Sequence, residues 1–129
     1  MIAIDANAVV AMLVDDADLG RLSRRVYRDH DLAAPDLLPY EVTSVLRKLW
    51  RTEVLTPRAA ERALTKLGLL RLSAVPHGDI SSRMWELRDN LSAYNAAYVA
   101  VAEFFDVPLL TFDKRVRNAP GPSCRFVQT

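Results

Sequence analysis

Short apolar runs alternate with amphipathic segments from one end of the chain to the other. The apolar runs have the length and aliphatic character of buried strands, and they cover residues 1–5, 32–34, 69–75 and 107–113. A further strand is expected at 123–128. Between the runs, apolar residues recur every three or four positions, as in amphipathic helices. This alternation predicts a single α/β domain over residues 1–129, with a central, mostly parallel β-sheet of four to five strands and helices on both faces.

Proline, glycine and capping residues set the bounds of several predicted helices. Pro39 places one helix start between Leu38 and Glu41, because proline is tolerated only in a first helical turn. Thr56 is a typical N-cap, and Gly68 ends the helix that follows it. Helices are therefore predicted over residues 7–14, 19–30, 38–51, 57–68, 77–90 and 93–105.

Helical spacing also assigns several side chains to the core. Leu19, Leu22 and Val26 fall on one face of their helix, opposite a row of arginines. The same argument favours core positions over base stacking for the large aromatic residues Trp50, Trp85, Tyr94 and Tyr98.

The composition is that of a small globular protein, and it limits the choice of partners. Of the 129 residues, 50% are hydrophobic and 26% are charged, and the net charge is only +1. Global charge therefore does not predict nucleic-acid binding, and a polyanion must be held by local clusters. Most clusters of this kind are solvated helix faces. The candidates are Arg21, Arg24, Arg25, Arg28, Arg47, Lys48, Arg51, Lys114, Arg115 and Arg117.

Cysteine usage and hydropathy indicate the compartment. The single cysteine, Cys124, excludes an internal disulfide and is expected to be an unreactive thiol in a late strand. No apolar stretch has the length needed to cross a bilayer, and the first residues lack the positive segment of a signal peptide. A cytoplasmic location is therefore expected.

Two acidic residues end predicted strands. Asp5 follows the first apolar run, and Asp113 closes a late one. The carboxyl ends of parallel strands meet at the same edge of a sheet, where ligands bind near a switch in strand order. Each acid also has a local explanation, since aspartate is a good cap for a following helix. The shared edge is the first indication of a functional site.

Glu41 and Asn95 lie in the first turns of two predicted helices, from which they can reach the same edge. The helix macrodipole alone favours an acid at Glu41, by about 0.3–1 kcal/mol. Asn95 follows Ser92 by three residues, where Glu or Gln usually completes the cap. Three carboxylates gathered at one edge repel by roughly 4 kcal/mol per pair, so they need a cation or shifted pKa values. Oxygen ligands indicate Mg²⁺ or Mn²⁺, which activate water for phosphate-ester hydrolysis.

Four stretches, in order along the chain, resemble the PIN-domain family, and most of all the VapC-type toxin ribonucleases of bacterial toxin–antitoxin pairs. They are MIAIDANAVVAML, APDLLPYEVTSVLRK, LSAYNAAYVAVAE and VPLLTFDKRVRNAPG. The resemblance implies a metal-dependent endoribonuclease in which four acids hold Mg²⁺ or Mn²⁺ and activate the water that cuts RNA. The first, second and fourth acids correspond to Asp5, Glu41 and Asp113. Asn95 stands at the third position, where the family usually has aspartate.

An amide at position 95 puts the activity of this chain in question. The side-chain oxygen of Asn95 can ligate Mg²⁺ but brings no charge, so we expect weaker metal binding and poor or absent RNA cleavage. Natural divergence and a deliberate inactivating substitution both account for the asparagine at position 95. A catalytically silent PIN-like module that binds an antitoxin and regulates it is therefore the alternative function.

The resemblance also implies partners and supporting residues. A VapB-like antitoxin would pack over the early helices, where Leu19–Tyr27 offers an apolar stripe that the chain's own core explains equally well. A homodimer and an RNA substrate are expected. Asn7 and Ser92 are candidates for orienting the metal ligands, although Asn7 is explained equally well as a helix cap. Candidates for contact with RNA phosphates are Arg88, Lys114 and Arg115.

Two other α/β families conflict with the residues after the first strand. A response-regulator receiver has an acidic pair there, and a haloacid-dehalogenase-type phosphatase has the motif D-x-D. This chain has Asp5-Ala6-Asn7, with a single acid. Neither the acidic pair of the receiver nor the general acid of the phosphatase is present.

Overall fold

Four parallel strands form one sheet at the centre of the computed structural model, which describes residues 1–129. Their order is β3-β2-β1-β4, and each neighbouring pair is parallel. The strands are β1 (Ile2–Ile4), β2 (Leu32–Pro35), β3 (Leu72–Val75) and β4 (Leu109–Leu110). The helices are α1 (Ala6–Val14), α2 (Asp18–Asp29), α3 (Leu38–Arg51), α4 (Pro57–Gly68), α5 (His77–Glu86), α6 (Ala93–Phe105) and α7 (Lys114–Asn118). The predicted α/β class is confirmed.

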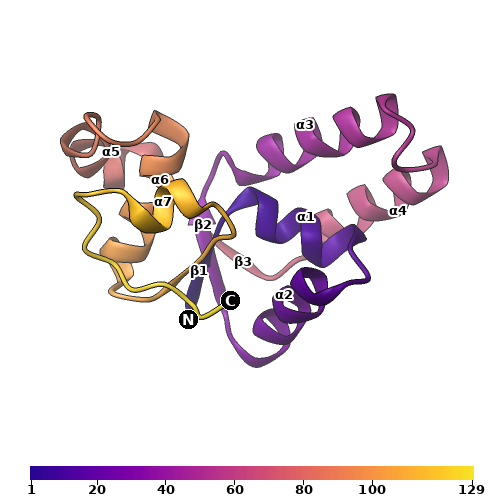
Figure 1. The fold of residues 1–129 in the computed structure, drawn as a ribbon, viewed down its shortest axis with the longest axis horizontal. Helices are drawn as coiled ribbons and strands as arrows, with labels where there is room; N and C mark the ends of the chain where they lie inside the picture. The colour runs from indigo at the N-terminus through magenta and orange to yellow at the C-terminus, as the bar shows by residue number, and fades with distance from the viewer.

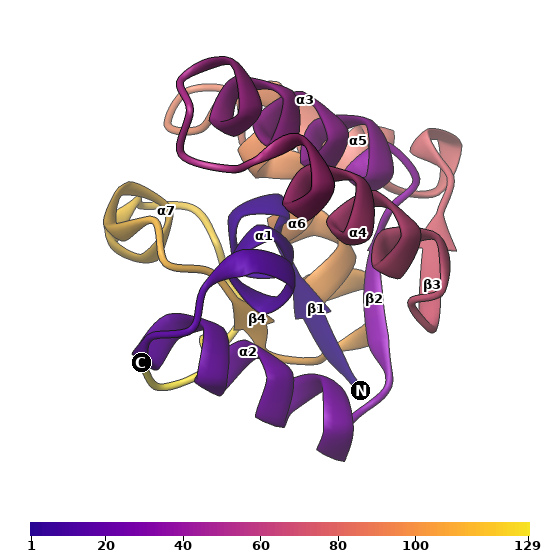
Figure 2. The ribbon, with the colours of Figure 1, turned by 90° about the vertical axis from the view of Figure 1, so that its right-hand side faces the viewer.

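Helices cover both faces of the sheet, as the sequence predicted. On one face α6 contacts β1, β2 and β4, and α5 packs against α6. On the other face α1 contacts α2, α3 and α4 (Figures 1 and 2). α3 and α4 form a helical hairpin that extends away from the sheet (Figure 1). α1 and α3 begin directly after β1 and β2, so their first turns lie at the carboxyl edge of the sheet.

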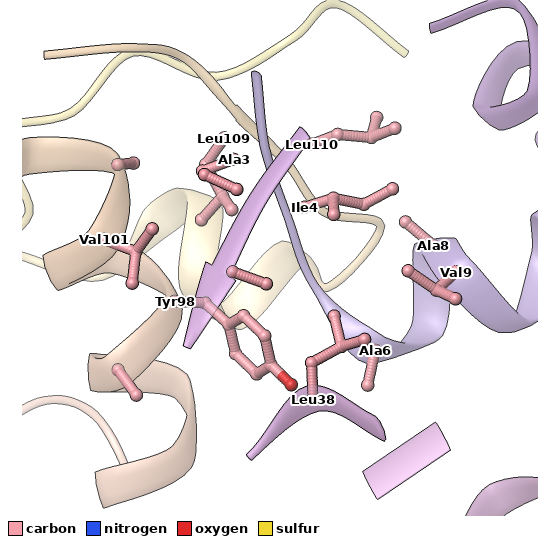
Figure 3. Packing of buried hydrophobic residues seen from close by; sticks show 14 of the residues in the cluster. Ala3, Ile4, Ala6, Ala8, Val9, Leu38, Tyr98, Val101, Leu109 and Leu110 are labelled. Carbon is pink, nitrogen blue, oxygen red and sulfur yellow. The ribbon is translucent and has the colours of Figure 1, made fainter. Parts of the chain in front are cut away.

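The core consists of aliphatic strand residues and small residues on α6. Ile4, Leu32 and Leu109 are fully buried. Four alanines of α6 are also buried, and their small side chains let the helix lie close to the sheet. They are Ala96, Ala97, Ala100 and Ala102. Figure 3 shows this layer, in which Tyr98 and Val101 of α6 face the strands.

The buried face of α2 differs from the prediction. Leu19 is 44% exposed, whereas Gly20, Ser23 and Val26 are buried. The cause is a close backbone approach, since a Cβ atom at Gly20 would lie 1.8 Å from the carbonyl oxygen of Asp15. Only glycine fits this contact, so the helix turns its small residues inward and leaves Leu19 in solvent.

Three of the four large aromatic residues assigned to the core are exposed, which corrects that assignment. Trp50, Trp85 and Tyr94 are 48%, 68% and 63% exposed, and only Tyr98 is buried. Helical spacing shows that residues share a face, but it does not show which face meets the sheet. In α3 and α5 smaller aliphatic residues occupy the inner face, and the tryptophans lie outside.

The end of the chain contains less strand than predicted. β4 is two residues long and ends at Leu110, so Asp113 lies in the turn before α7 and not at the strand end itself. Residues 123–128 form no strand, and only one bridge joins Phe126 to Leu109. Cys124 is half-buried in this segment, and burial raises the pKa of its thiol to about 11, so the thiol stays protonated at neutral pH. None of the helices is long and apolar enough to cross a membrane.

Candidate functional site

The site lies where the strand order reverses. From β1 the chain builds β2 and β3 on one side, and it returns only at the end to add β4 on the other side. In an open parallel sheet this reversal leaves a crevice beyond the carboxyl ends of the two strands that flank it. Here those strands are β1, which is followed by Asp5, and β4, which leads through a short turn to Asp113.

Asp5 is a buried carboxylate that also caps α1. Its Oδ1 accepts a hydrogen bond of 2.9 Å from the backbone N–H of Ala8, so the predicted capping role is confirmed. Only 8% of the residue is exposed. Burial raises the pKa of Asp5, and the negative charge of Asp113 adds to this rise. Capping and metal binding are compatible, because a carboxylate has lone pairs beyond the one that α1 uses.

Thr111 lies between the two aspartates in sequence and space, and its role is not evident from local sequence patterns. It is fully buried between β4 and Asp113. Its hydroxyl oxygen accepts a hydrogen bond of 3.1 Å from the backbone N–H of Asp113. The same hydroxyl lowers the pKa of Asp5, because it can donate to the carboxylate. A hydroxyl residue inside the apolar run LLTF was the available signal, because a buried polar side chain needs a partner.

Asp113 is held by Arg115. Its Oδ1 accepts from the backbone N–H of Arg115 at 2.9 Å, which caps α7. The guanidinium donates to both carboxylate oxygens, at 3.2 Å from Nε and 3.1 Å from Nη2. These bonds from Arg115 lower the pKa of Asp113. The Arg115 side chain is 88% exposed, so this ion pair is weak and exchangeable.

Glu41 is positioned by a contact between distant helices. The hydroxyl of Tyr98 on α6 donates a hydrogen bond of 3.0 Å to Oε1 of Glu41, in the first turn of α3. Figure 3 shows the Tyr98 ring directed from α6 toward Leu38 at the start of α3. Partial burial raises the pKa of Glu41, and the charge of Asp5 raises it further. Asp5 therefore interacts electrostatically with both other acids.

Asn95 occupies the first turn of α6, as predicted. Its backbone N–H donates to the Ser92 hydroxyl at 3.2 Å, so Ser92 is the N-cap of the helix. The half-buried side-chain amide of Asn95 makes no hydrogen bond within the protein. Asn95 and Tyr98 are three residues apart and so share a face of α6, the face from which Tyr98 reaches Glu41.

Comparison with known proteins identifies the family. A family profile described as the PIN domain matches residues 2–122. The chain belongs to the PIN-domain family. A VapC ribonuclease from Mycobacterium bovis is 35% identical over 96% of this chain and 94% of its own length. Ribonuclease VapC1 from Mycobacterium tuberculosis is 36% identical over 95% and 93%.

Solved structures agree on the fold of this PIN domain. VapBC2 from Rickettsia felis, crystallised with a fragment of its promoter DNA, matches with a TM-score of 0.68 at 13% identity, covering 98% of both chains. VapC20 from Mycobacterium tuberculosis, described as a sarcin-ricin loop cleaving toxin, matches with a TM-score of 0.67 at 15% identity, covering 91% of this chain and 93% of its own.

The donor set of the PIN domain fits a hard divalent cation. All candidate ligands are oxygen atoms, which suit Mg²⁺ or Mn²⁺ better than Zn²⁺. The raised pKa values of Asp5 and Glu41 mark a desolvated negative site that lacks a countercharge. The three acids do not form a ready cluster, since no group of three His, Cys, Asp or Glu side chains is close enough together to hold an ion. The carboxylate of Asp113 is instead paired with Arg115.

The residues predicted to support the metal ligands or to contact RNA differ in how far they are engaged within the PIN domain. Asn7 is exposed in the first turn of α1, and its backbone N–H contributes to lowering the pKa of Asp5. Arg88 stacks over the Trp85 ring at 4.7 Å and donates to the Trp85 carbonyl oxygen, so it is engaged at the end of α5. Lys114 is exposed beside Asp113.

Proposed function

We propose that residues 1–129 act as one PIN domain of the VapC type, a toxin endoribonuclease that hydrolyses RNA with a divalent metal ion. The observation that carries the proposal is a buried Asp5 at the strand-order reversal, coupled electrostatically to Glu41 and Asp113. The ribonuclease names of relatives at 35–36% identity over nearly the whole chain support it. A cytoplasmic location fits a substrate of this kind.

Each acid has a distinct part in the proposed mechanism. Asp5 and Asp113 would anchor Mg²⁺ or Mn²⁺, with Asn95 as an uncharged ligand and Glu41 holding the ion or orienting water. The bound ion supplies an activated water and neutralises charge on the phosphodiester. Glu41 has Oε1 fixed by Tyr98, and its raised pKa makes it a better proton acceptor than an ordinary carboxylate. Because water is the nucleophile, the products carry a 3′-hydroxyl and a 5′-phosphate.

We further propose a VapB-like antitoxin and a homodimer. A structural relative, VapBC2 from Rickettsia felis, is named as a VapB and VapC pair. Leu19 is 44% exposed on α2. Leu19 therefore offers the antitoxin an apolar contact that the core does not use.

Metal-dependent cleavage tests the proposal. The purified chain is incubated with single-stranded RNA and Mn²⁺, and the ends of the products are mapped. We expect slow cleavage that leaves 5′-phosphates, and no cleavage after chelation of the metal. Products with a 2′,3′-cyclic phosphate, or cleavage that persists in EDTA, would refute the mechanism.

The silent antitoxin-binding module is the second candidate, and Asn95 is the observation that favours it. Replacing a carboxylate with an amide removes one full charge from the metal ligands. The two functions separate in one experiment: a silent module binds its antitoxin but cuts no RNA at any Mn²⁺ concentration, and Asn95→Asp restores cleavage.

A further inference from the structure

The lysines and arginines of α3 and α4 differ from those elsewhere in the chain. Six of the 17 lie on this hairpin, and all six are exposed and make no ion pair or side-chain hydrogen bond. They are Arg47, Lys48, Arg51, Arg58, Arg62 and Lys66. Of the other eleven, eight donate side-chain hydrogen bonds to carboxylates or carbonyl oxygens. The hairpin also carries two exposed acids, Glu53 and Glu61, so it has an excess of positive charge that no ion pair neutralises.

An exposed tryptophan lies among these cations. Trp50 is 48% exposed near the end of α3. A surface hollow at the tip of the hairpin is lined by Arg47, Trp50 and Arg51, together with the acid Glu53. A second hollow runs from Trp50 and Arg47 toward Leu64 of α4 and includes Glu61. Free guanidinium groups beside an exposed aromatic ring are the two elements that bind single-stranded nucleic acid, one for phosphates and one for bases.

The cations also continue from the acidic site along one helix. Lys48 lies two turns after Glu41 on nearly the same side of α3, about 10 Å away at 1.5 Å per residue, and Arg51 lies about 15 Å away. A stacked strand advances about 3.4 Å per phosphate, so the distance of about 15 Å from Glu41 to Arg51 spans roughly four nucleotides. α3 thus runs from the acids at its first turn to the hollow at its last.

We propose that the α3–α4 hairpin is a binding surface for single-stranded RNA. Lys48, Arg47 and Arg51 contact consecutive phosphates, and Trp50 stacks on a base. The inference rests on the proposed function, because it takes the strand that reaches Glu41 as the occupant. Free cations spread over two helices suit an extended polyanion, and an exposed indole ring suits bases better than it suits acidic side chains.

Binding measured without metal tests the proposal. A fluorescent single-stranded 12-mer RNA is titrated with the chain in EDTA at several salt concentrations. We expect the triple variant Arg47→Ala, Lys48→Ala, Arg51→Ala to bind at least 10-fold more weakly. Its salt slope should fall by about 2, since each lost phosphate contact to a single strand removes about 0.7. Trp50→Ala should weaken binding about 10-fold and leave the slope unchanged.

A matched control carries the same loss of charge on α2. The variant Arg21→Ala, Arg25→Ala, Arg28→Ala should change the dissociation constant less than twofold, and circular dichroism verifies the fold of each variant. Equal losses in the two triple variants would overturn the proposal, because they would show only a net-charge effect. Unchanged RNA binding together with weaker binding of a polyglutamate 12-mer would also overturn it and assign the hairpin to an acidic protein segment.

The outcome is separable from that of the proposed function. Hairpin-dependent binding without any Mn²⁺-dependent cleavage would refute the endoribonuclease and leave the RNA surface standing. Normal cleavage with RNA binding that does not depend on the hairpin would refute the surface alone.

Discussion

The acids at the carboxyl edge of the sheet and the cations of the α3–α4 hairpin hold their charges in opposite surroundings. Asp5 and Glu41 are buried or half-buried, and each receives hydrogen bonds from residues fixed elsewhere in the fold. The hairpin cations are all exposed and have no partner. Burial and fixed hydrogen-bond partners set the position and the pKa of the carboxylates, which catalysis requires. Exposed side chains without partners can instead adapt to a flexible polyanion.

The acidic edge should be far more sensitive to single changes than the hairpin. Asp5→Asn keeps the cap on α1, because asparagine caps a helix as well as aspartate does. It removes the carboxylate that interacts with both other acids, so we expect Mn²⁺-dependent cleavage to fall at least 100-fold in an RNA cleavage assay. Asp79→Asn is the matched control, an exposed first-turn acid of α5, and should leave the rate unchanged. Similar cleavage rates for Asp5→Asn and wild type would show that the acidic edge is not more sensitive to single substitutions than the hairpin.

Sequence alone could predict the layout of the fold and the acids, for identifiable reasons. Asp5 was found because it follows an apolar run directly, and Glu41 because Pro39 fixes the start of α3. Both signals are local. The predicted end of the late strand at Asp113 was wrong because β4 stops at Leu110, where its pairing with β1 ends.

The residues that position the acids were beyond local patterns. Tyr98 reaches Glu41 across 57 positions of sequence, and Thr111 connects Asp5 to Asp113 only after β1 and β4 have paired. The exposure of Trp50 was missed for a related reason, since the inward face of α3 is set by packing against α1 and α4. Which residues are close together is a property of the assembled sheet.

Asn95 allows the charge of the acidic edge to be raised without disturbing its packing. Asn95→Asp adds a carboxylate on the face of α6 that carries Tyr98, so we expect Mn²⁺ to bind about 10-fold more tightly and cleavage to accelerate. Calorimetric titration with Mn²⁺ measures the first effect. The exposed Asn118→Asp, near the end of α7, is the control for added charge. An affinity that rises equally in the two variants would show that Asn95 is not a ligand.

Tyr98→Phe tests whether a fixed partner matters at the acidic edge. The ring stays in the core, and only the hydrogen bond to Glu41 is lost, at a cost of about 1 kcal/mol in the free energy of unfolding. We expect kcat to fall about 3- to 10-fold with little change in KM, because a freed Glu41 no longer orients water. Tyr94→Phe, at a residue that is 63% exposed, should change neither quantity. Loss of stability with an unchanged kcat would assign Tyr98 a packing role alone.

The smallest effect concerns the pH dependence of stability. The folded state raises the pKa of Glu41 above its unfolded value of 4.5, so Glu41 favours folding below that value and loses this contribution as pH rises through the folded pKa. Glu41→Gln removes the titration, so in urea unfolding we expect the variant to gain stability relative to wild type between pH 4 and pH 7. The gain should be modest, since solvent screens a half-buried group. Glu53→Gln, at an exposed position of the hairpin, is the control substitution. If the stability difference between Glu41→Gln and wild type does not change with pH, the ionised carboxylate of Glu41 does not destabilise the fold. Glu41 would then not differ in this respect from the exposed charges of the hairpin.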